Sequence, residues 1–136
     1  MTLVIDGSTT LGFLLTDEQP GSATKALDAL ESGVPTIVPA HWCVEVANGL
    51  IMAERRKRAS QADITEALNL VAALPVVTDD ETAQRAVSDT AALARQHGLT
   101  IYDAAYLELA MRRGASLATT DNDLAKAAKA AGVALF

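Results

Sequence analysis

The chain has 136 residues, half of them hydrophobic, which is enough for one domain with a substantial core. No apolar run is long enough to cross a bilayer, and the amino-terminal segment lacks the pattern of a signal peptide. The net charge of −6 argues against a broad basic surface for nucleic acids, although a bound metal ion can invert the field locally. The single cysteine, Cys43, excludes an internal disulfide and indicates a reducing, cytoplasmic location. We expect Cys43 to be a small buried hydrophobe.

Short β-branched runs alternate with Ala-rich amphipathic segments, which is typical of βαβ units around a mostly parallel sheet. The pattern therefore predicts an α/β fold: one domain over residues 1–136, with a central parallel sheet of four or five strands flanked by helices. The predicted strands are 3–5, 36–38, 75–77, 116–119 and 133–135. The predicted helices are 9–15, 23–31, 41–56, a helix capped at Ser60, 81–96, 102–113 and 124–131, with a loop at 17–21.

Five acidic residues occupy positions that converge on one edge of this sheet. Asp6 ends the first strand, and Asp121 and Asp123 follow the fourth strand. Asp103 begins a helix, and Glu45 lies about one turn into the helix after the second strand, off its packing face. Because the carboxyl ends of parallel strands share an edge, where ligands bind in open α/β sheets, we expect these side chains to face one cleft.

Such a cluster is difficult to explain by stability, because neighbouring carboxylates repel and raise one another's pKa. Mg²⁺ or Mn²⁺ prefers oxygen ligands and would relieve that repulsion. The ion can also activate water near neutral pH and offset charge on a phosphate, so the pattern favours metal-assisted hydrolysis of a phosphodiester. Ser8 and Thr120 are candidates for hydroxyl contacts to water or phosphate, and Asn48 for a hydrogen bond to Glu45 or Asp6.

The same acids also have structural interpretations. Aspartate favours turns and helix N-caps, which applies to Asp6, Asp103 and Asp121, while Asp123 is our preferred cap for the last helix. Glu45 would then be an exposed helix acid paired with a base one turn away. Three further side chains are assigned by position: His41 and His97 as residues at helix ends, and Trp42 as a core or dimer contact.

The strongest basic cluster is the run Arg55, Arg56, Lys57 and Arg58, at the end of the helix predicted over 41–56. Two interpretations stay open for it. Such runs are commonly solvated helix ends, where positive charge complements the helix dipole. The alternative is contact with an RNA backbone by an otherwise acidic protein.

Four segments in order resemble the motifs of a PIN domain. They are V-I-D-G-S-T at residues 4–9, E-V-A-N at 45–48, Y-D-A-A-Y-L at 102–107 and T-T-D-N-D-L at 119–124. Chain length and motif order are similar to those of the small bacterial PIN toxins of the VapC type. Gly7 departs from the family pattern, in which a residue with a side chain is common, whereas Asp6 and Ser8 keep their places.

The resemblance implies a three-layer α/β/α sandwich and an Mg²⁺- or Mn²⁺-dependent endoribonuclease. It places the catalytic, metal-binding acids at Asp6, Glu45, Asp103 and Asp121, with Asp123 as a further acid near the metal. It also implies a homodimer that acts as the toxin of a type II toxin–antitoxin pair. A VapB-type antitoxin would silence it by crossing the active-site cleft, in a heterotetramer or larger assembly without a membrane partner.

Two other functions stay open at this point. One is a hydrolase of small phosphate esters with Asp6 as covalent nucleophile, although such enzymes commonly carry a second Asp two residues later, where this chain has Ser8. The other is a non-catalytic module whose acidic cleft binds a basic partner peptide. Such a module should not be stabilised by Mg²⁺ or Mn²⁺.

Overall fold

The computed structural model describes residues 1–15 and 21–136. Within them, a four-stranded parallel sheet has the order β3-β2-β1-β4. Its strands are β1 (Leu3–Ile5), β2 (Thr36–Val38), β3 (Val76–Thr78) and β4 (Ser116–Ala118). The predicted α/β class is confirmed, and β1 lies between β2 and β4 in the sheet.

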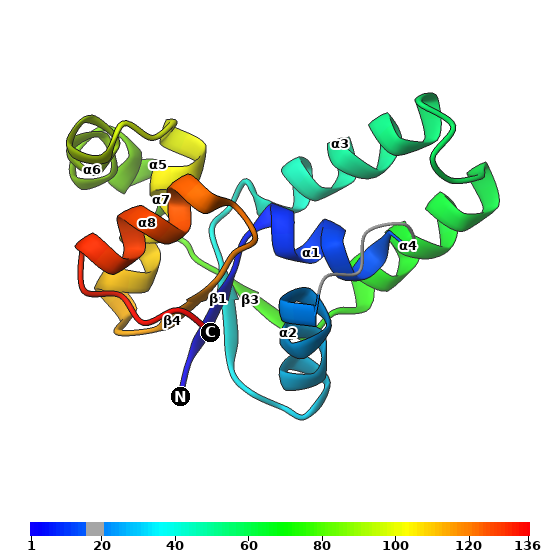
Figure 1. The fold of residues 1–136 in the computed structure, drawn as a ribbon, viewed down its shortest axis with the longest axis horizontal. Coiled ribbons are helices and arrows are strands. Elements are labelled where there is room, and N and C mark those ends of the chain that lie inside the picture. Colours follow the sequence, from blue (N-terminus) through cyan, green and yellow to red (C-terminus); the bar gives the residue numbers. More distant parts are fainter. Residues whose placement is uncertain (16–20) are drawn as a thin grey trace.

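Helices cover both sides of this sheet (Figure 1). The first four, α1 to α4, lie on one side, and α5 to α8 lie on the other, where α7 packs against β1 and β4. None of the described helices is long and apolar enough to span a membrane. Their bounds are α1 (Gly7–Leu14), α2 (Gly21–Glu31), α3 (Trp42–Arg55), α4 (Gln61–Ala73), α5 (Thr82–Ala86), α6 (Asp89–His97), α7 (Ile101–Arg113) and α8 (Asn122–Ala130).

The core lies around β1, whose three residues are fully buried. Helix α3 contributes to this core a stripe of buried residues at helical spacing, which includes Trp42, Val46 and Leu50. The Trp42 indole N–H donates to the Thr10 hydroxyl at 3.0 Å, so Trp42 is a core residue and not a dimer contact. The prediction that Cys43 is buried was wrong, because position 43 lies off this stripe and its side chain is exposed.

Two predicted elements differ from the structure. The helix predicted over 81–96 is divided into α5 and α6 at Val87 and Ser88, where Ser88 leaves the helical region with φ −131° and ψ −99°. The Ala-rich pattern continues across this break, so periodicity does not reveal it. The strand predicted at 133–135 is reduced to one parallel bridge between Leu135 and Leu117 of β4. Residues 17–20 of the predicted loop lie outside the described residues, and Gly21 already belongs to α2.

Helices α3 and α4 form an arm that extends away from the sheet (Figure 1). The turn between them contains Lys57 in the left-handed region, with φ 58°. We call residues Arg55, Arg56, Lys57 and Arg58 the basic tip, because they form the end of this arm and are exposed. The arm begins directly after β2, so its base lies at the carboxyl edge of the sheet, beside the end of β1.

Candidate active site

Asp6 stands where β1 ends and α1 begins, and it is 3% exposed. It is the N-cap of α1, because its Oδ1 accepts the backbone N–H of Thr9 at 2.8 Å. The Ser8 hydroxyl lies 2.8 and 2.9 Å from the two carboxylate oxygens, and the Thr119 hydroxyl donates to Oδ2. Burial raises the pKa of Asp6, and these hydrogen bonds offset part of the rise. Asp6 is therefore a capping residue that also lies at the carboxyl edge of the sheet.

Glu45 lies in the first turn of α3, and its carboxylate accepts a hydrogen bond from a residue of α7. The Tyr106 hydroxyl donates to Oε2 at 3.2 Å, and the His41 Nε2 lies 3.8 Å from the same oxygen. Burial lowers the pKa of His41, so His41 is a weak source of positive charge at neutral pH. The pKa of Glu45 is raised, first by burial and then by the charges of Asp103 and Asp6.

The remaining predicted acids come from the starts of α7 and α8. Thr100 caps α7 through the backbone N–H of Asp103 at 3.1 Å, so Asp103 is not the capping side chain. Asp121 caps α8 and accepts the N–H of Leu124 at 2.9 Å. The preference for Asp123 as cap was therefore wrong: Asp121 is the extended residue at the helix start, and Asp123 already lies inside the helix.

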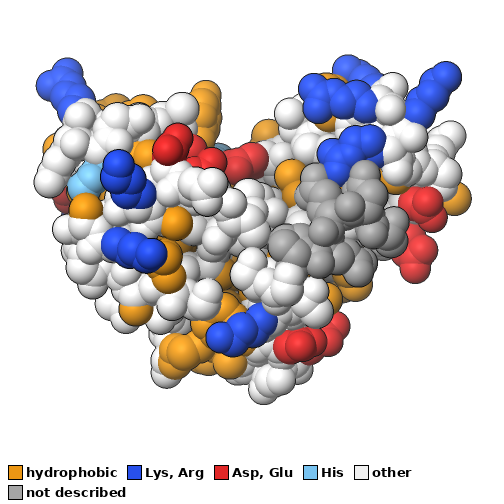
Figure 2. Space-filling view, in the orientation of Figure 1, with side chains coloured by type: hydrophobic (Ala, Val, Ile, Leu, Met, Phe, Trp, Pro, Cys, Tyr) orange, Lys and Arg blue, Asp and Glu red, His pale blue; other side chains and the backbone are white. Residues whose placement is uncertain are grey.

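These five acids, Asp6, Glu45, Asp103, Asp121 and Asp123, are called the acidic cluster. They influence one another electrostatically: burial raises the pKa of Asp103, and the charges of Asp121, Asp6 and Asp123 raise it further. Figure 2 shows acidic side chains gathered at the base of the notch between the arm and the rest of the molecule. Within the described residues, the ion-pair contact of this cluster is with His41 and not with Lys or Arg. The cluster therefore lacks cationic compensation from the described side chains.

The acidic cluster is open rather than closed around one point. Within the described residues, no three of its members have ligand oxygens that all lie within 4.8 Å of one another. Direct coordination of one ion by three of these acids would therefore need side-chain movement. An all-oxygen donor set without cationic partners fits a hard divalent cation.

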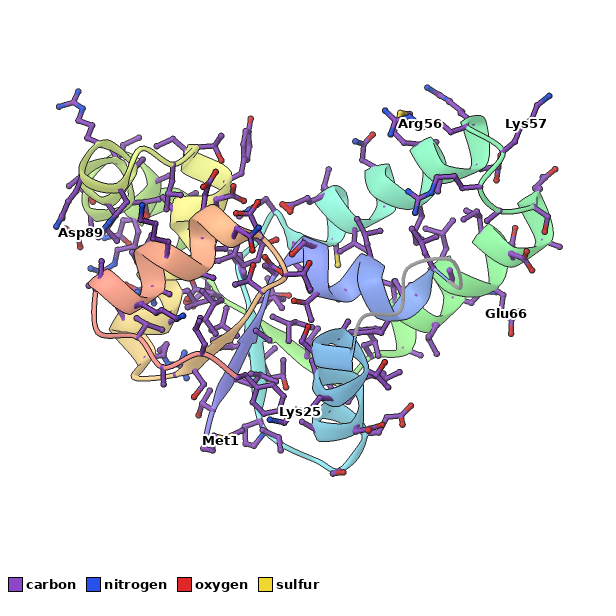
Figure 3. All side chains as sticks on the ribbon, viewed as in Figure 1. Met1, Lys25, Arg56, Lys57, Glu66 and Asp89 are labelled. Atoms are coloured by element: carbon purple, nitrogen blue, oxygen red, sulfur yellow. The ribbon has the colours of Figure 1, made fainter. Side chains whose placement is uncertain are left out.

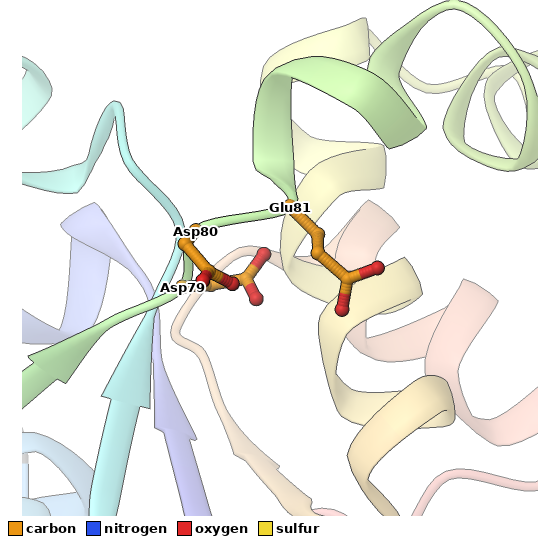
Figure 4. Close-up of side chains that lie close together, drawn as sticks. All are labelled: Asp79, Asp80 and Glu81. Carbon is orange, nitrogen blue, oxygen red and sulfur yellow. The ribbon is translucent and has the colours of Figure 1, made fainter.

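A different acidic group, Asp79, Asp80 and Glu81, has oxygens within 4.8 Å and satisfies the geometry for a metal (Figure 4). Arginines occupy it instead. Arg112 donates to both oxygens of Asp79 at 3.1 and 2.8 Å and to Glu81 at 3.1 Å, and Arg85 donates to Glu81 at 3.1 Å. Arg112 also contacts Glu108 at 2.9 Å. Asp79 and Glu81 are therefore already paired with arginines, which makes this group a weaker candidate for a metal than the acidic cluster.

A hollow of about 430 Å³ adjoins the acidic cluster, between the starts of α3 and α7. Glu45 and Asp103 line it together with the exposed side chains of Val44 and Tyr102. Asn48 also lines this hollow, and within the described contacts it makes no hydrogen bond to Glu45 or Asp6. The site therefore combines carboxylates with an accessible apolar wall.

Two residues of the site were not predicted from the sequence. Thr119, not Thr120, contacts Asp6 through its hydroxyl, whereas Thr120 donates its backbone N–H to Ser8 at 3.2 Å. The choice between adjacent threonines depends on where β4 ends, at Ala118. Tyr106 is fully buried, and the need of a buried hydroxyl for a partner is the signal that could have led to its contact with Glu45.

Comparison with known proteins places this geometry in a family. The sequence model described as "PIN domain" matches residues 3–130. The chain belongs to the PIN-domain family. This PIN domain is 30% identical over 126 residues to Ribonuclease VapC3 of Pyrobaculum aerophilum, covering 93% of this chain and 94% of the relative.

Solved structures share the fold of this PIN domain. PAE2754 from Pyrobaculum aerophilum superposes with a TM-score of 0.69 at 20% identity, over 93% of this chain and 79% of that one. VapBC2 from Rickettsia felis, bound to a DNA fragment from its promoter, gives a TM-score of 0.67 at 14% identity, over 100% and 98% of the two chains. These likenesses confirm the fold, a parallel sheet between two layers of helices.

Proposed function

We propose that this PIN domain is a metal-dependent endoribonuclease that hydrolyses RNA phosphodiester bonds and serves as the toxin of a VapBC-type pair. The observation that carries the proposal is the acidic cluster, in which burial raises the pKa of Asp6, and burial together with the charges of neighbouring acids raises the pKa of Glu45 and Asp103. Folding would not assemble such a group for stability, because the repulsion opposes it. The name of the relative, Ribonuclease VapC3, supports the same activity.

The metal assigned to the site is Mg²⁺ or Mn²⁺, with Asp6, Glu45, Asp103 and Asp121 as its ligands, directly or through water, and Asp123 beside them. When bound, such an ion supplies an activated water near neutral pH and offsets charge on the phosphate. The chain's own groups prepare the site: Ser8 and Thr119 orient Asp6, and Tyr106 orients Glu45. Asp121 is fixed by capping α8, with Oδ1 used for that bond.

The partners proposed are an RNA strand, a second copy of the chain and a VapB-type antitoxin, in the cytoplasm. The solved VapBC2 complex of Rickettsia felis shares this fold over the whole chain, which supports an antitoxin partner. The basic tip is the proposed RNA contact. Arg56 and Lys57 lie at the far end of the arm (Figure 3). Glu45 lies in the first turn of α3, about 15 Å along the helix from Arg55.

Asp6→Asn tests the proposal most directly. Asparagine also caps helices well, so α1 should persist, while a charged ligand is removed. We expect RNA cleavage with Mg²⁺ or Mn²⁺ to fall by more than about 100-fold, since even the partners of metal ligands commonly contribute 10–100-fold. The matched control is Asp28→Asn, an exposed acid on α2. Full cleavage by a pure Asp6→Asn preparation would show that the catalytic site lies elsewhere.

Two measurements separate this function from the alternatives. A small-molecule phosphohydrolase would release phosphate from a simple phosphate ester, with Asp6 as nucleophile. This role is disfavoured because such enzymes commonly carry a second Asp two residues after the nucleophile, where this chain has Ser8. A peptide-binding module would show no rise in melting temperature on titration with Mn²⁺. We expect such a rise, together with cleavage that stops when EDTA is added.

A further inference from the structure

Gly7, the first residue of α1, lies directly against the carboxylate of Glu45. A Cβ atom placed on Gly7 would lie 2.3 Å from Oε1 of Glu45 and 2.8 Å from its Cδ. Real Cβ contacts are longer than this, so the carboxylate occupies space that a side chain at position 7 would fill. Gly7 also follows Asp6 immediately, so this contact brings Glu45 to the backbone beside the buried acid.

The backbone of Gly7 does not itself call for glycine. The glycines with positive φ among the described residues are Gly33, Gly98, Gly114 and Gly132, and Gly7 is not one of them. Within a helix, alanine is preferred to glycine on conformational grounds. The absent side chain is therefore explained by the neighbouring carboxylate and not by the helix.

We propose that Gly7 is a positioning residue: its bare backbone lets the Glu45 carboxylate reach the Asp6 side of the acidic cluster. This inference rests on the metal-dependent function proposed above. Glu45 is held between two surfaces, with Gly7 against Oε1 and the Tyr106 hydroxyl on Oε2 at 3.2 Å. A side chain at position 7 would occupy the place of the carboxylate and force it away from Asp6, while the Tyr106 hydroxyl would stay where it is.

Gly7→Ala is the variant that tests this role. The nearest atoms belong to the far end of a flexible side chain, so we expect Glu45 to move and the fold to persist. The direct readout is Mn²⁺ affinity of the purified protein, by calorimetry or by the paramagnetic signal of free Mn²⁺. We expect affinity to fall about tenfold, the scale found when a partner of a metal ligand is lost, with unchanged or higher melting temperature in EDTA.

Gly21→Ala is the matched control, because Gly21 also begins a helix and no atom of residues 1–15 or 21–136 lies within 4 Å of its Cβ position. A double-mutant cycle with Glu45→Ala then isolates the contact. Once Glu45 is truncated, adding Gly7→Ala should change Mn²⁺ affinity no further.

Three outcomes are informative. If Gly7→Ala binds Mn²⁺ like the wild type while Glu45→Ala binds weakly, the positioning role is wrong and the proposed function stands. If Gly7→Ala lowers affinity equally with and without Glu45, the effect is general distortion and the positioning role is again wrong. If the wild type itself binds no Mn²⁺, the metal-dependent function fails first.

Discussion

Asp103 shows at the scale of one residue how the acidic cluster opposes folding. Its pKa is raised by burial and by the charges of Asp121 and Asp6, although it lies in the first turn of α7, where negative charge is normally favoured. An acid whose pKa is higher in the folded state binds its proton more tightly there. Ionised Asp103 therefore destabilises the metal-free domain.

This destabilisation has a defined pH window. It is absent below the unfolded pKa, near 3.9, develops as the pH rises through the folded value, and is complete above it. In EDTA at pH 7 we expect Asp103→Asn to raise the melting temperature by roughly 1–3 °C, which corresponds to a few tenths of a kcal/mol for a domain of this size. The gain should vanish near pH 4.

Calorimetry in EDTA and in Mn²⁺ measures both sides of this prediction. With saturating Mn²⁺ the order should reverse, because the wild type gains binding energy that the variant loses. A variant that melts below the wild type at pH 7 in EDTA would contradict the repulsion argument. Asp28→Asn, at an exposed position of α2, should leave the melting temperature unchanged in either buffer.

At the scale of elements, Arg112 joins α7 to the segment that follows β3. Its guanidinium, 15% exposed, contacts Asp79, Glu81 and Glu108. Burial alone would raise the pKa of Asp79, but the hydrogen bonds and charge of Arg112 lower it below its usual value. The same contacts raise the pKa of Arg112.

Arg112→Leu should lower the free energy of unfolding by about 3–5 kcal/mol, because Asp79 and Glu108 would remain buried without a cation. Urea denaturation at pH 7 measures this loss, with Arg113→Leu, an exposed neighbour, as control. The contribution of Asp79 is fully present above its unfolded pKa, near 3.9, and is lost as the pH falls through the lower folded value. If Arg112→Leu and Arg113→Leu unfolded at the same urea concentration, the contacts of Arg112 would make no net contribution to stability.

The elements also show what sequence patterns predict well. The strands at Leu3–Ile5 and Thr36–Val38 and the buried stripe of α3 follow from local periodicity, so both were predicted. The ends of α6 and α7 at Gly98 and Gly114, with φ 65° and 58°, follow from glycine's access to the left-handed region. The convergence of the five acids follows from parallel topology, which is a property of the whole sheet.

The remaining details depend on contacts between distant segments. The choice of Asp121 over Asp123 as cap and of Thr119 over Thr120 as partner depends on the last residue of β4, a shift of one or two positions. The Gly7–Glu45 contact and the contacts of Arg112 with Asp79 and Glu81 join residues more than 30 positions apart. No periodicity in a single sequence encodes such pairs.

At the scale of the whole molecule, charge is separated across the notch. The net charge is −6, yet the tip of the arm is basic while acidic side chains gather at the base (Figure 2). Arg56 and Lys57 lie at the far end of the arm (Figure 3). A strand of RNA that reaches the acidic cluster would thus meet positive charge beyond it, which supports the RNA interpretation over a merely solvated helix end.

Replacing Arg55, Arg56 and Lys57 with Gln should weaken RNA binding and its dependence on salt. Each phosphate contact contributes about 0.7 to the logarithmic salt slope for single strands, so three contacts would lower the slope by about 2. Binding of a labelled RNA to Asp6→Asn protein, titrated over KCl concentration, measures the slope without cleavage. Lys25→Gln, on α2 away from the arm, is the control (Figure 3). An unchanged slope would show that the basic tip is a solvated helix end that does not contact RNA.

The exposed position of Cys43 has a practical consequence for following these events. It is the single thiol of the chain, and it stands on α3 two residues before Glu45. A maleimide dye would therefore attach at one defined place, on the first turn of α3. Fluorescence of that label should report, in real time, the arrival of an ion, a nucleic acid or an inhibitory peptide at the arm's base.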